Sequence, residues 1–302
     1  MKISVGLPFH NNEATLADAV RSVFAQSIDD WELILMDDGS TDGSLRIAQA
    51  VRDDRVRVYS DGVNRRLAYR LNQITDLAQG RYVARMDADD LMHPERLAKQ
   101  AEILDRRPEV DVVTTAAYSL DKTDQIRGLR GGAAPDLTAW GVLKRSPFVH
   151  PTMLGRVEWF ARNRYAANKH RAEDHELFIR VSRTLSNVHL CEALYFCREE
   201  RSIQVCKYLA SCRDDRDAFR KYGPALVGVR RTLHLCALSL LKGEVHRIAA
   251  AFGCEHLFVR RRNEPVIREE RLEGMRVIAK ILSWGVPGLP TRRASEPAEA
   301  TA

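Results

Sequence analysis

The chain has 302 residues, of which 45% are hydrophobic and 29% charged, and this composition is typical of a globular protein with a sizeable core. The formal net charge is +6. Residues 1–198 contain 28 Lys and Arg against 28 Asp and Glu, whereas residues 199–302 contain 19 against 13, so the whole excess lies in the last third. No uncharged apolar run of about 18 residues is present, which excludes a membrane-spanning helix. The short apolar start is interrupted by Pro8, so we expect no signal peptide and a cytoplasmic location.

The first half alternates predicted strands with predicted helices. Strands are predicted at 3–8, 31–36, 56–59, 82–86 and 110–115. Apolar residues at helical spacing begin at residues 16, 44 and 67, and a fourth helix is predicted at 95–105. This alternation predicts an α/β fold with a mainly parallel sheet. The six cysteines lie between residues 191 and 254 without CxxC spacing, so we expect reduced thiols and no zinc site.

Acidic turns follow the second and fourth predicted strands. These turns are Asp37-Asp38 and Asp87-Ala88-Asp89-Asp90. Ligands of open α/β sheets bind outside the carboxyl ends of the strands, where both turns would lie. Clustered carboxylates suit Mg²⁺ or Mn²⁺, which would hold a diphosphate. The alternative is that Asp89 or Asp90 only caps the helix at 95–105. A dinucleotide GxGxxG or a P-loop is absent from these turns.

These motifs resemble those of the family 2 glycosyltransferases of the GT-A fold, especially bacterial enzymes that build capsules, exopolysaccharides and lipopolysaccharide. The matching stretches are 7–11, 37–42, 64–72 and 86–90. The resemblance covers residues 1–203 and implies a Rossmann-like, mixed and mainly parallel sheet flanked by helices. It divides this domain into a nucleotide-sugar half, about 1–115, and an acceptor half, about 116–203.

The resemblance also implies site residues and a cofactor. It implies a nucleotide-sugar donor, with a UDP-sugar favoured, and Mn²⁺ or Mg²⁺ as the metal. Donor contacts are expected from Leu7, Pro8, Phe9, Asn11, Glu13 and Asp38, with Asp87 and Ala88 on the ribose side. Asp89 is expected to hold the metal, and Asp90 can exchange roles with it.

The acceptor half contains two further candidate motifs. His150 and Thr152 resemble a His-Pro-Thr motif that lines the acceptor side in the family, although a lone His is more often structural.

Residues 121–135, with three glycines, are predicted to form a loop. Glu173 and Asp174 precede an apolar helix, where acidic residues also favour the positive helix start. Inverting transfer needs one carboxylate to accept a proton, and the resemblance favours Asp174 over Glu173.

Residues 194–203 depart from the family pattern. Cys197 and Glu199 stand where relatives often have Arg and His, so a further metal or diphosphate ligand from this loop is doubtful. Residues 204–288 are predicted to form a basic helical extension with helices at 203–221, 224–242, 244–259 and 265–283. Residues 289–302 are predicted to be a disordered tail. Arg230-Arg231 and Arg260-Arg261-Arg262, beside apolar helices, are compatible with peripheral contact with an anionic membrane.

The predicted function is inverting, metal-dependent transfer of a sugar to a hydroxyl of a saccharide or lipid-linked acceptor in bacterial surface polysaccharide synthesis. Two alternatives stay open: an inactive nucleotide-sugar-binding module, and a membrane-associated assembly protein. No nucleic-acid partner is expected, because the basic residues lack an aromatic platform. The sequence does not determine the sugar, the linkage or the oligomeric state.

Overall fold

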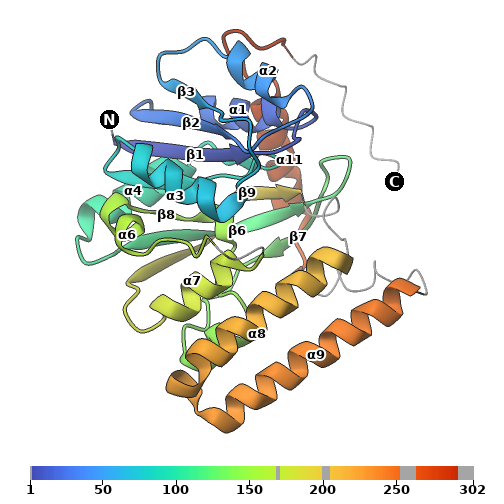
Figure 1. Ribbon diagram of the computed structural model, residues 1–302. Helices are drawn as coiled ribbons and strands as arrows, with labels where there is room; N and C mark the ends of the chain where they lie inside the picture. The colour runs from blue at the N-terminus through green and yellow to red at the C-terminus, as the bar shows by residue number, and fades with distance from the viewer. Residues whose placement is uncertain (1, 168–170, 199–204, 252–262, 292–302) are drawn as a thin grey trace.

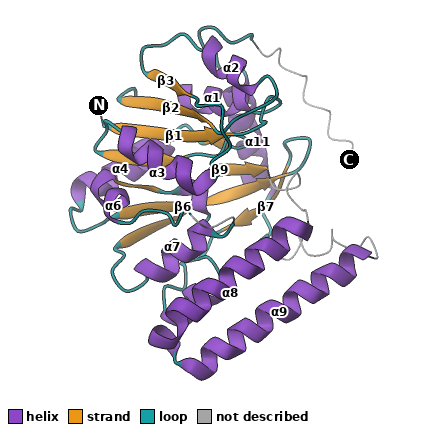
Figure 2. Cartoon of the chain, in the orientation of Figure 1, coloured by secondary structure: helices purple, strands orange, loops and turns teal. Residues whose placement is uncertain are grey.

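The computed structural model describes residues 2–167, 171–198, 205–251 and 263–291. Within these residues, a single mixed sheet runs through the molecule and helices cover both of its faces (Figures 1 and 2). This arrangement confirms the predicted α/β class and the mainly parallel sheet.

The sheet begins as a parallel unit and becomes mixed. Its strands are β1 (Ile3–Phe9), β2 (Trp31–Asp37), β3 (Val56–Tyr59), β4 (Tyr82–Arg85), β5 (Leu91–Met92), β6 (Val112–Leu120), β7 (Ile126–Arg130), β8 (Leu154–Arg156) and β9 (Asn187–Arg198). Their order is β3-β2-β1-β4-β8-β6-β9-β5, with β7 beside β6. The first four are parallel neighbours, whereas β8 is antiparallel to both β4 and β6. The carboxyl ends of β1, β2 and β4 therefore meet at one edge.

Two sets of helices cover the sheet. The described helices are α1 (Leu16–Phe24), α2 (Ser44–Ala50), α3 (Leu67–Leu77), α4 (Arg96–Arg106), α5 (Ala139–Lys144), α6 (Val157–Arg162), α7 (Glu173–Val181), α8 (Val205–Val227), α9 (Val229–Ala251) and α11 (Arg268–Leu282), with a 3₁₀ turn η1 (His150–Thr152). Helices α1, α2 and α4 contribute to one hydrophobic cluster, and α3, α5, α6, α7, α8 and α9 to the other. Each of these helices thus buries apolar side chains in one of the two clusters.

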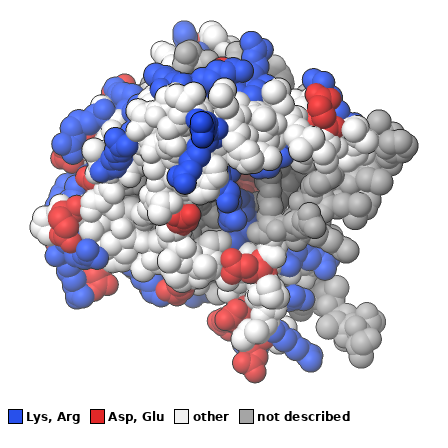
Figure 3. Space-filling model, turned by 90° about the horizontal axis from the view of Figure 1, so that it is seen from below, with Lys and Arg blue, Asp and Glu red and all other residues white. Residues whose placement is uncertain are grey.

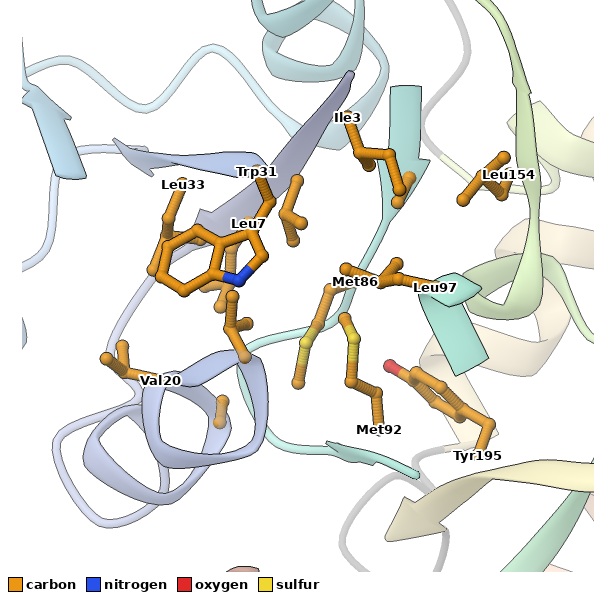
Figure 4. Close-up of a cluster of buried hydrophobic side chains, with 14 of the residues drawn as sticks. Ile3, Leu7, Val20, Trp31, Leu33, Met86, Met92, Leu97, Leu154 and Tyr195 are labelled. Atoms are coloured by element: carbon orange, nitrogen blue, oxygen red, sulfur yellow. The ribbon is translucent and has the colours of Figure 1, made fainter. Parts of the chain in front are cut away.

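The core lies directly beneath the acidic turn. Met86, Met92 and Tyr195 are fully buried there, next to Leu97 of α4 (Figure 4). Side chains in a close-packed interior have few alternative positions. The turn between β4 and β5 is therefore held from below by a rigid apolar base.

The predicted loop at 121–135 contains a strand. Residues 126–130 form β7, which pairs antiparallel with β6. Three glycines concealed the strand, because glycine ordinarily weakens strands and marks turns. The loop prediction was wrong for these five residues and holds for those on either side.

The C-terminal helices pack on the sheet domain at two places. Helices α8 and α9 lie side by side at the bottom of Figure 1. Ala218 and Phe219 of α8 and Leu235 of α9 belong to the hydrophobic cluster that contains α7. Helix α9 continues through Gly243, where the sequence had predicted a break. The last described segment, 263–291, returns to the other face, where Ile278 and Ile281 are buried.

The predicted disordered tail begins too early. Leu289 packs against the main core, and the Pro290 carbonyl accepts a hydrogen bond from Arg21 at 2.6 Å. Residues 289–291 thus belong to the packed segment, and 292–302 lie outside the described residues. Among the residues described, no helix has the length and apolar character needed to cross a bilayer.

Candidate active site

The carboxyl ends of β1 and β2 are joined by a backbone hydrogen bond. Phe9 lies opposite Asp37 in the parallel register, and the Asp38 N–H donates to the Phe9 carbonyl at 2.8 Å. Leu7, Pro8 and Phe9 are buried within β1, so their side chains face the core. The donor contact predicted for these three residues would therefore be made by their backbone.

Asp38 anchors the loop that precedes α3. Its carboxylate accepts hydrogen bonds from the Arg65 and Arg66 N–H groups and from Arg70 Nε, which is 2.9 Å away. Arg70 is fully buried and also binds Asp61 at 2.6 Å. Gly39 passes close to this loop with φ of +72°, and a Cβ there would lie 2.8 Å from Asn64 N. The loop at 61–66 is therefore held against the β2 turn.

Asn11 and Glu13 both hold the loop that enters α2. The Asn11 side chain accepts a hydrogen bond from Thr41 N at 2.8 Å, and Glu13 accepts one from Gly43 N at 3.0 Å. Asn11 has a positive φ of 55°, which asparagine tolerates better than most residues. Both residues lie at the edge of the sheet where β1 and β2 end, and their side chains stabilise its loops.

Three carboxylates converge in the turn after β4. Asp87, Asp89 and Asp90 each offer an oxygen, and these atoms all lie within 4.8 Å of one another. Ala88, between them, is buried and keeps the turn tight. Asp87 is held by both terminal nitrogens of the buried Arg85, at 2.8 and 3.2 Å. Asp90 is buried and accepts hydrogen bonds from Arg198 N, at 2.9 Å, and from the Tyr195 hydroxyl.

The acidic cluster is electrostatically unfavourable without a cation. Burial and the charge of Asp87 raise the pKa of Asp89 to about 6. Burial and the charges of Asp89 and Asp87 raise the pKa of Asp90 well above its ordinary value. Three hard oxygen donors around one point match the ligands that Mg²⁺ and Mn²⁺ prefer. The residues present therefore fit the implied metal.

The helix-capping alternative does not hold. Helix α4 starts at Arg96 after an N-cap at Glu95, and no side chain caps it. Asp89 and Asp90 precede β5 in the chain, and β5 separates them from the helix. Their convergence is thus unrelated to the helix start.

The first turn of α7 faces this acidic turn across Arg85. Burial and the charge of Asp174 raise the pKa of Glu173 to about 7, and the charges of Arg85 and Asp87 also act on this group. Asp174 is half-buried, and its carboxylate accepts a hydrogen bond from the Ser146 hydroxyl at 3.3 Å. The two halves of the predicted domain thus contribute carboxylates to one site.

His150 and Thr152 are both buried, and they differ in their hydrogen-bond partners. The buried His150 ring shares a hydrogen bond of 2.8 Å with the Tyr165 hydroxyl, and burial, followed by the charge of Arg85, places its pKa well below the ordinary value. A neutral His150 near Arg85 suits a site wall and not a proton acceptor. Thr152 is fully buried and donates to the Val149 carbonyl, so its side chain supports the wall from behind.

Sequence reasoning missed the cations and the tyrosine that hold the acidic turn. Arg85 interrupts an apolar strand immediately before the acidic turn, and a charged residue in such a run signals a buried ion pair. Arg198 binds Asp124 at 2.6 Å and the Asp89 carbonyl at 3.1 Å, and Tyr195 lies three residues before it. No local pattern could have linked residues separated by about a hundred positions. Of the two departures from the family pattern, Cys197 is buried in β9, and Glu199 lies outside the described residues.

A polar cavity of about 370 Å³ adjoins Arg198, between the start of α1 and the β6–β7 turn. Its lining residues are Ala14, Thr15, Asp18, Lys122, Thr123, Asp124 and Arg198. Arg198 connects this cavity to the acidic turn, since its backbone N–H binds Asp90. The cavity is therefore an outer part of the same site.

Comparisons with known proteins give consistent results. The family model described as "Glycosyl transferase family 2" matches residues 4–169. The Bacillus subtilis (strain 168) protein EpsE, named as a glycosyltransferase, is 38% identical over 207 residues, which cover 66% of this chain and 73% of EpsE. TuaG of the same organism, named as a glycosyltransferase of teichuronic acid biosynthesis, is 39% identical over 107 residues, covering 35% of this chain and 42% of TuaG.

A solved structure shows the same fold. Residues 1–349 of TarS from S. aureus, in complex with UDP-GlcNAc, superpose with a TM-score of 0.60 at 17% identity. The match covers 94% of this chain and 81% of the other. At this identity the likeness concerns the fold alone.

Proposed function

The chain belongs to glycosyl transferase family 2 and has a GT-A fold, and from this premise we propose that it transfers a sugar, with inversion, from a UDP-sugar to a hydroxyl of a saccharide or lipid-linked acceptor. The convergence of Asp87, Asp89 and Asp90 at the carboxyl edge of the sheet carries the proposal. The solved relative that binds UDP-GlcNAc supports the choice of donor, and the name of TuaG supports a role in bacterial surface polysaccharide synthesis.

The nucleotide would lie along the ends of β1, β2 and β4. The backbone at 7–9, with Asn11, Glu13 and Asp38 beside it, would receive the base, and Asp87 and Ala88 would adjoin the ribose. Asp89 would hold Mn²⁺ or Mg²⁺, with Asp90 as its neighbour, and a bound divalent cation would neutralise charge on the diphosphate as it leaves. Arg85 keeps Asp87 in place in this arrangement, because its two terminal nitrogens bind both carboxylate oxygens.

Asp174 would act as the base. It would accept the proton of the acceptor hydroxyl while that oxygen forms a bond to the anomeric carbon. The bond from the anomeric carbon to the diphosphate oxygen breaks on the opposite side, and its electron pair leaves with UDP. Glu173 and Asp174 lie in different environments. Burial and the charge of Asp174 raise the pKa of Glu173 to about 7, whereas the Asp174 carboxylate accepts a hydrogen bond from the Ser146 hydroxyl.

A panel assay tests this function. UDP release would be measured with UDP-glucose, UDP-galactose and UDP-N-acetylglucosamine, with water as the acceptor and with Mn²⁺ or Mg²⁺ added. We expect one donor to be hydrolysed, and a chelator to stop the reaction. An inactive nucleotide-sugar-binding module would bind UDP without releasing it from any donor, and a protein that acts only in assembly would not bind UDP at all.

We further propose that α9 contacts an anionic membrane surface, at the inner face of the cell membrane if the protein is cytoplasmic. Helix α9 exposes the side chains Leu233, Leu240, Leu241, Val245 and Ile248. Arg231, Lys242 and Arg247 lie on the same helix, which has one acidic residue, Glu244. An exposed apolar face bordered by cations is the pattern of a helix that lies in a membrane interface. Figure 3 views the molecule from below, the side on which α8 and α9 lie, and shows Lys and Arg together with Asp and Glu around broad uncharged areas.

The second basic cluster that the sequence suggested for this contact, Arg260-Arg261-Arg262, lies outside the described residues. The membrane proposal therefore depends on α9.

A further inference from the structure

Helix α8 makes hydrogen bonds to both ends of the first turn of α7, which contains the carboxylate proposed as the base. On one side, the Arg171 N–H donates to Asp214 Oδ2 at 2.7 Å. On the other side, His175 Nδ1 lies 2.8 Å from Asp215 Oδ1. Two adjacent carboxylates of α8 thus hold the chain immediately before and immediately after Glu173 and Asp174.

The His175 ring is a double donor. Its second nitrogen, Nε2, lies 2.7 Å from the Val142 carbonyl of α5. A carboxylate and a carbonyl can only accept, so both ring nitrogens must carry a proton, and the ring is then an imidazolium. Burial lowers the pKa of His175, but the hydrogen bond and charge of Asp215, the Val142 carbonyl and the charge of Asp174 outweigh it and raise the pKa.

The rest of the α7–α8 contact keeps these bonds in register. Asp215, Ala218, Phe219 and Tyr222 recur at helical spacing and therefore lie on one face of α8. The Phe219 ring meets the His175 ring edge to face, with centroids 5.9 Å apart. The Tyr222 hydroxyl donates to Glu176 Oε1 at 2.6 Å. Helix α8 consequently reaches three residues of the α7 region with polar groups.

We infer that Asp215 is a positioning residue for the transfer reaction: through the His175 imidazolium it fixes the direction in which α7 presents Asp174 to the acceptor hydroxyl. This inference rests on the proposed function. It makes the C-terminal extension a part of the catalytic machinery, because α8 supplies a group that the sheet domain lacks. Asp214 assists by holding the backbone that enters the helix, where Ala172 adopts a left-handed conformation with φ of 52°.

The variant Asp215→Ala tests the inference in the full chain. We expect the kcat of UDP release to fall by about 10²-fold, the order associated with a small misplacement of a catalytic group, while KM for the UDP-sugar and the Kd of UDP stay unchanged. Asp215→Asn keeps an acceptor at the same place and should recover part of the lost rate. Asp217→Ala is the matched control, since it removes a carboxylate from the exposed side of the same helix.

A double-mutant cycle shows whether Asp215 acts through the base. If it does, Asp215→Ala should add little to the loss already caused by Asp174→Asn, because groups that act as a unit are not additive. Independent, multiplicative losses would overturn the inference, and so would a folded Asp215→Ala protein with wild-type kcat. A loss of UDP affinity together with kcat would indicate a purely structural role and would equally overturn it. Failure of the wild type to release UDP would instead refute the proposed function.

Discussion

At the scale of single residues, Asp89 determines how the site responds to pH and metal. The pKa of Asp89 is about 6, above the ordinary value of 3.8. Between these two pH values, the metal-free folded state therefore keeps a proton on Asp89 that the unfolded state has already lost. Stability of the metal-free protein should therefore fall as pH rises from about 4 to 6. A divalent cation replaces that proton, so its stabilising effect should grow over the same range and be complete above it.

The measurement is the shift in Tm caused by Mn²⁺ at pH 5 and at pH 7.5. We expect a small shift at pH 5 and a larger one at pH 7.5, and the Asp89→Asn variant should lose this difference together with UDP release. Asp76→Asn, on the exposed surface of α3, should behave as wild type. Equal Tm shifts for wild type at both pH values would contradict the metal assignment.

The two carboxylates of α7 can be separated by substitution. Asp174→Asn should lower the rate of UDP release by about 10²–10⁴-fold, the usual contribution of a general base, and leave the Kd of UDP unchanged. Glu173→Gln should retain most of the rate, because Glu173, whose pKa is raised to about 7 by burial and the charge of Asp174, is not the group proposed to accept the proton. The comparison is direct because each variant changes one atom at equal size. A reversed order of the two rates would move the base to Glu173.

The sequence indicated the acidic residues at strand and helix ends, and it did not indicate their partners. Asp38, Asp87, Asp89 and Asp174 stand in local motifs at strand or helix ends, where position in the chain already implies position in space. Arg198 reaches Asp90 and the Asp89 carbonyl only through tertiary packing, since β9 pairs with β5 and β6 across the sheet. Local patterns indicate which groups need a partner and not which distant residue provides it.

At the scale of elements, the link between β2 and α3 depends on one buried cation. Arg70 is buried among Asp38, Asp61 and the Val63 carbonyl. Arg70→Met should lower the free energy of unfolding by about 1–3 kcal/mol, because buried acceptors lose a donor. It should also weaken UDP binding, since the loop at 61–66 would no longer be held against Asp38.

Denaturant unfolding and calorimetric titration with UDP provide the two readouts. Arg65→Met is the control, because Arg65 is partly exposed although it also binds Asp61. Equal effects of the two variants would show that burial of Arg70 is unimportant.

Element positions in the parallel half followed directly from periodicity, whereas β7 and the long C-terminal helices did not. Strand β7 contains two arginines and one glycine among its five residues, and it pairs with the edge that β6 provides. Gly243 does not end α9, because it packs closely against Leu209 of α8. In both cases a tertiary contact outweighs the local preference.

At the scale of the whole molecule, the membrane proposal predicts binding that needs both charge and apolar area. The protein should co-sediment with vesicles of phosphatidylglycerol and phosphatidylcholine and dissociate only partly in high salt, because screening removes the electrostatic part alone. The double substitution Leu240→Glu with Leu241→Glu should abolish binding without changing UDP release. Leu272→Glu, at an equally exposed position on α11, is the matched control.

Two outcomes would count against membrane docking. One is equal recovery of the wild type with neutral and with anionic vesicles. The other is a dimer of the wild type, seen by analytical ultracentrifugation without lipid, that the Leu240/Leu241 double variant converts to a monomer. The exposed face of α9 would then be an interface between two copies of the chain.

The predicted boundary at residue 203 described the family motifs and not the folding unit. Composition changes there from balanced to basic, which suggested an appendage. The structure instead joins α8 to α7 and α11 to α1, because both helices carry apolar faces that match surfaces of the sheet domain. Deleting residues 204–302 would therefore expose core surface of the sheet domain. Such a deletion would disturb catalysis as well as membrane binding, and the two could not be told apart.

The return of segment 263–291 to the first helices has a consequence for biosynthesis. Val286 and Leu289 pack among residues from β1, α1 and α2, and Arg52 N donates to the Pro287 carbonyl at 2.9 Å. A ribosome makes chain at about 5–20 residues per second, so the first strands emerge many seconds before the segment that covers them. During that interval the nascent N-terminal half exposes apolar surface that the finished protein buries. We expect the nascent N-terminal half to need protection by chaperones until residues 263–291 have been made.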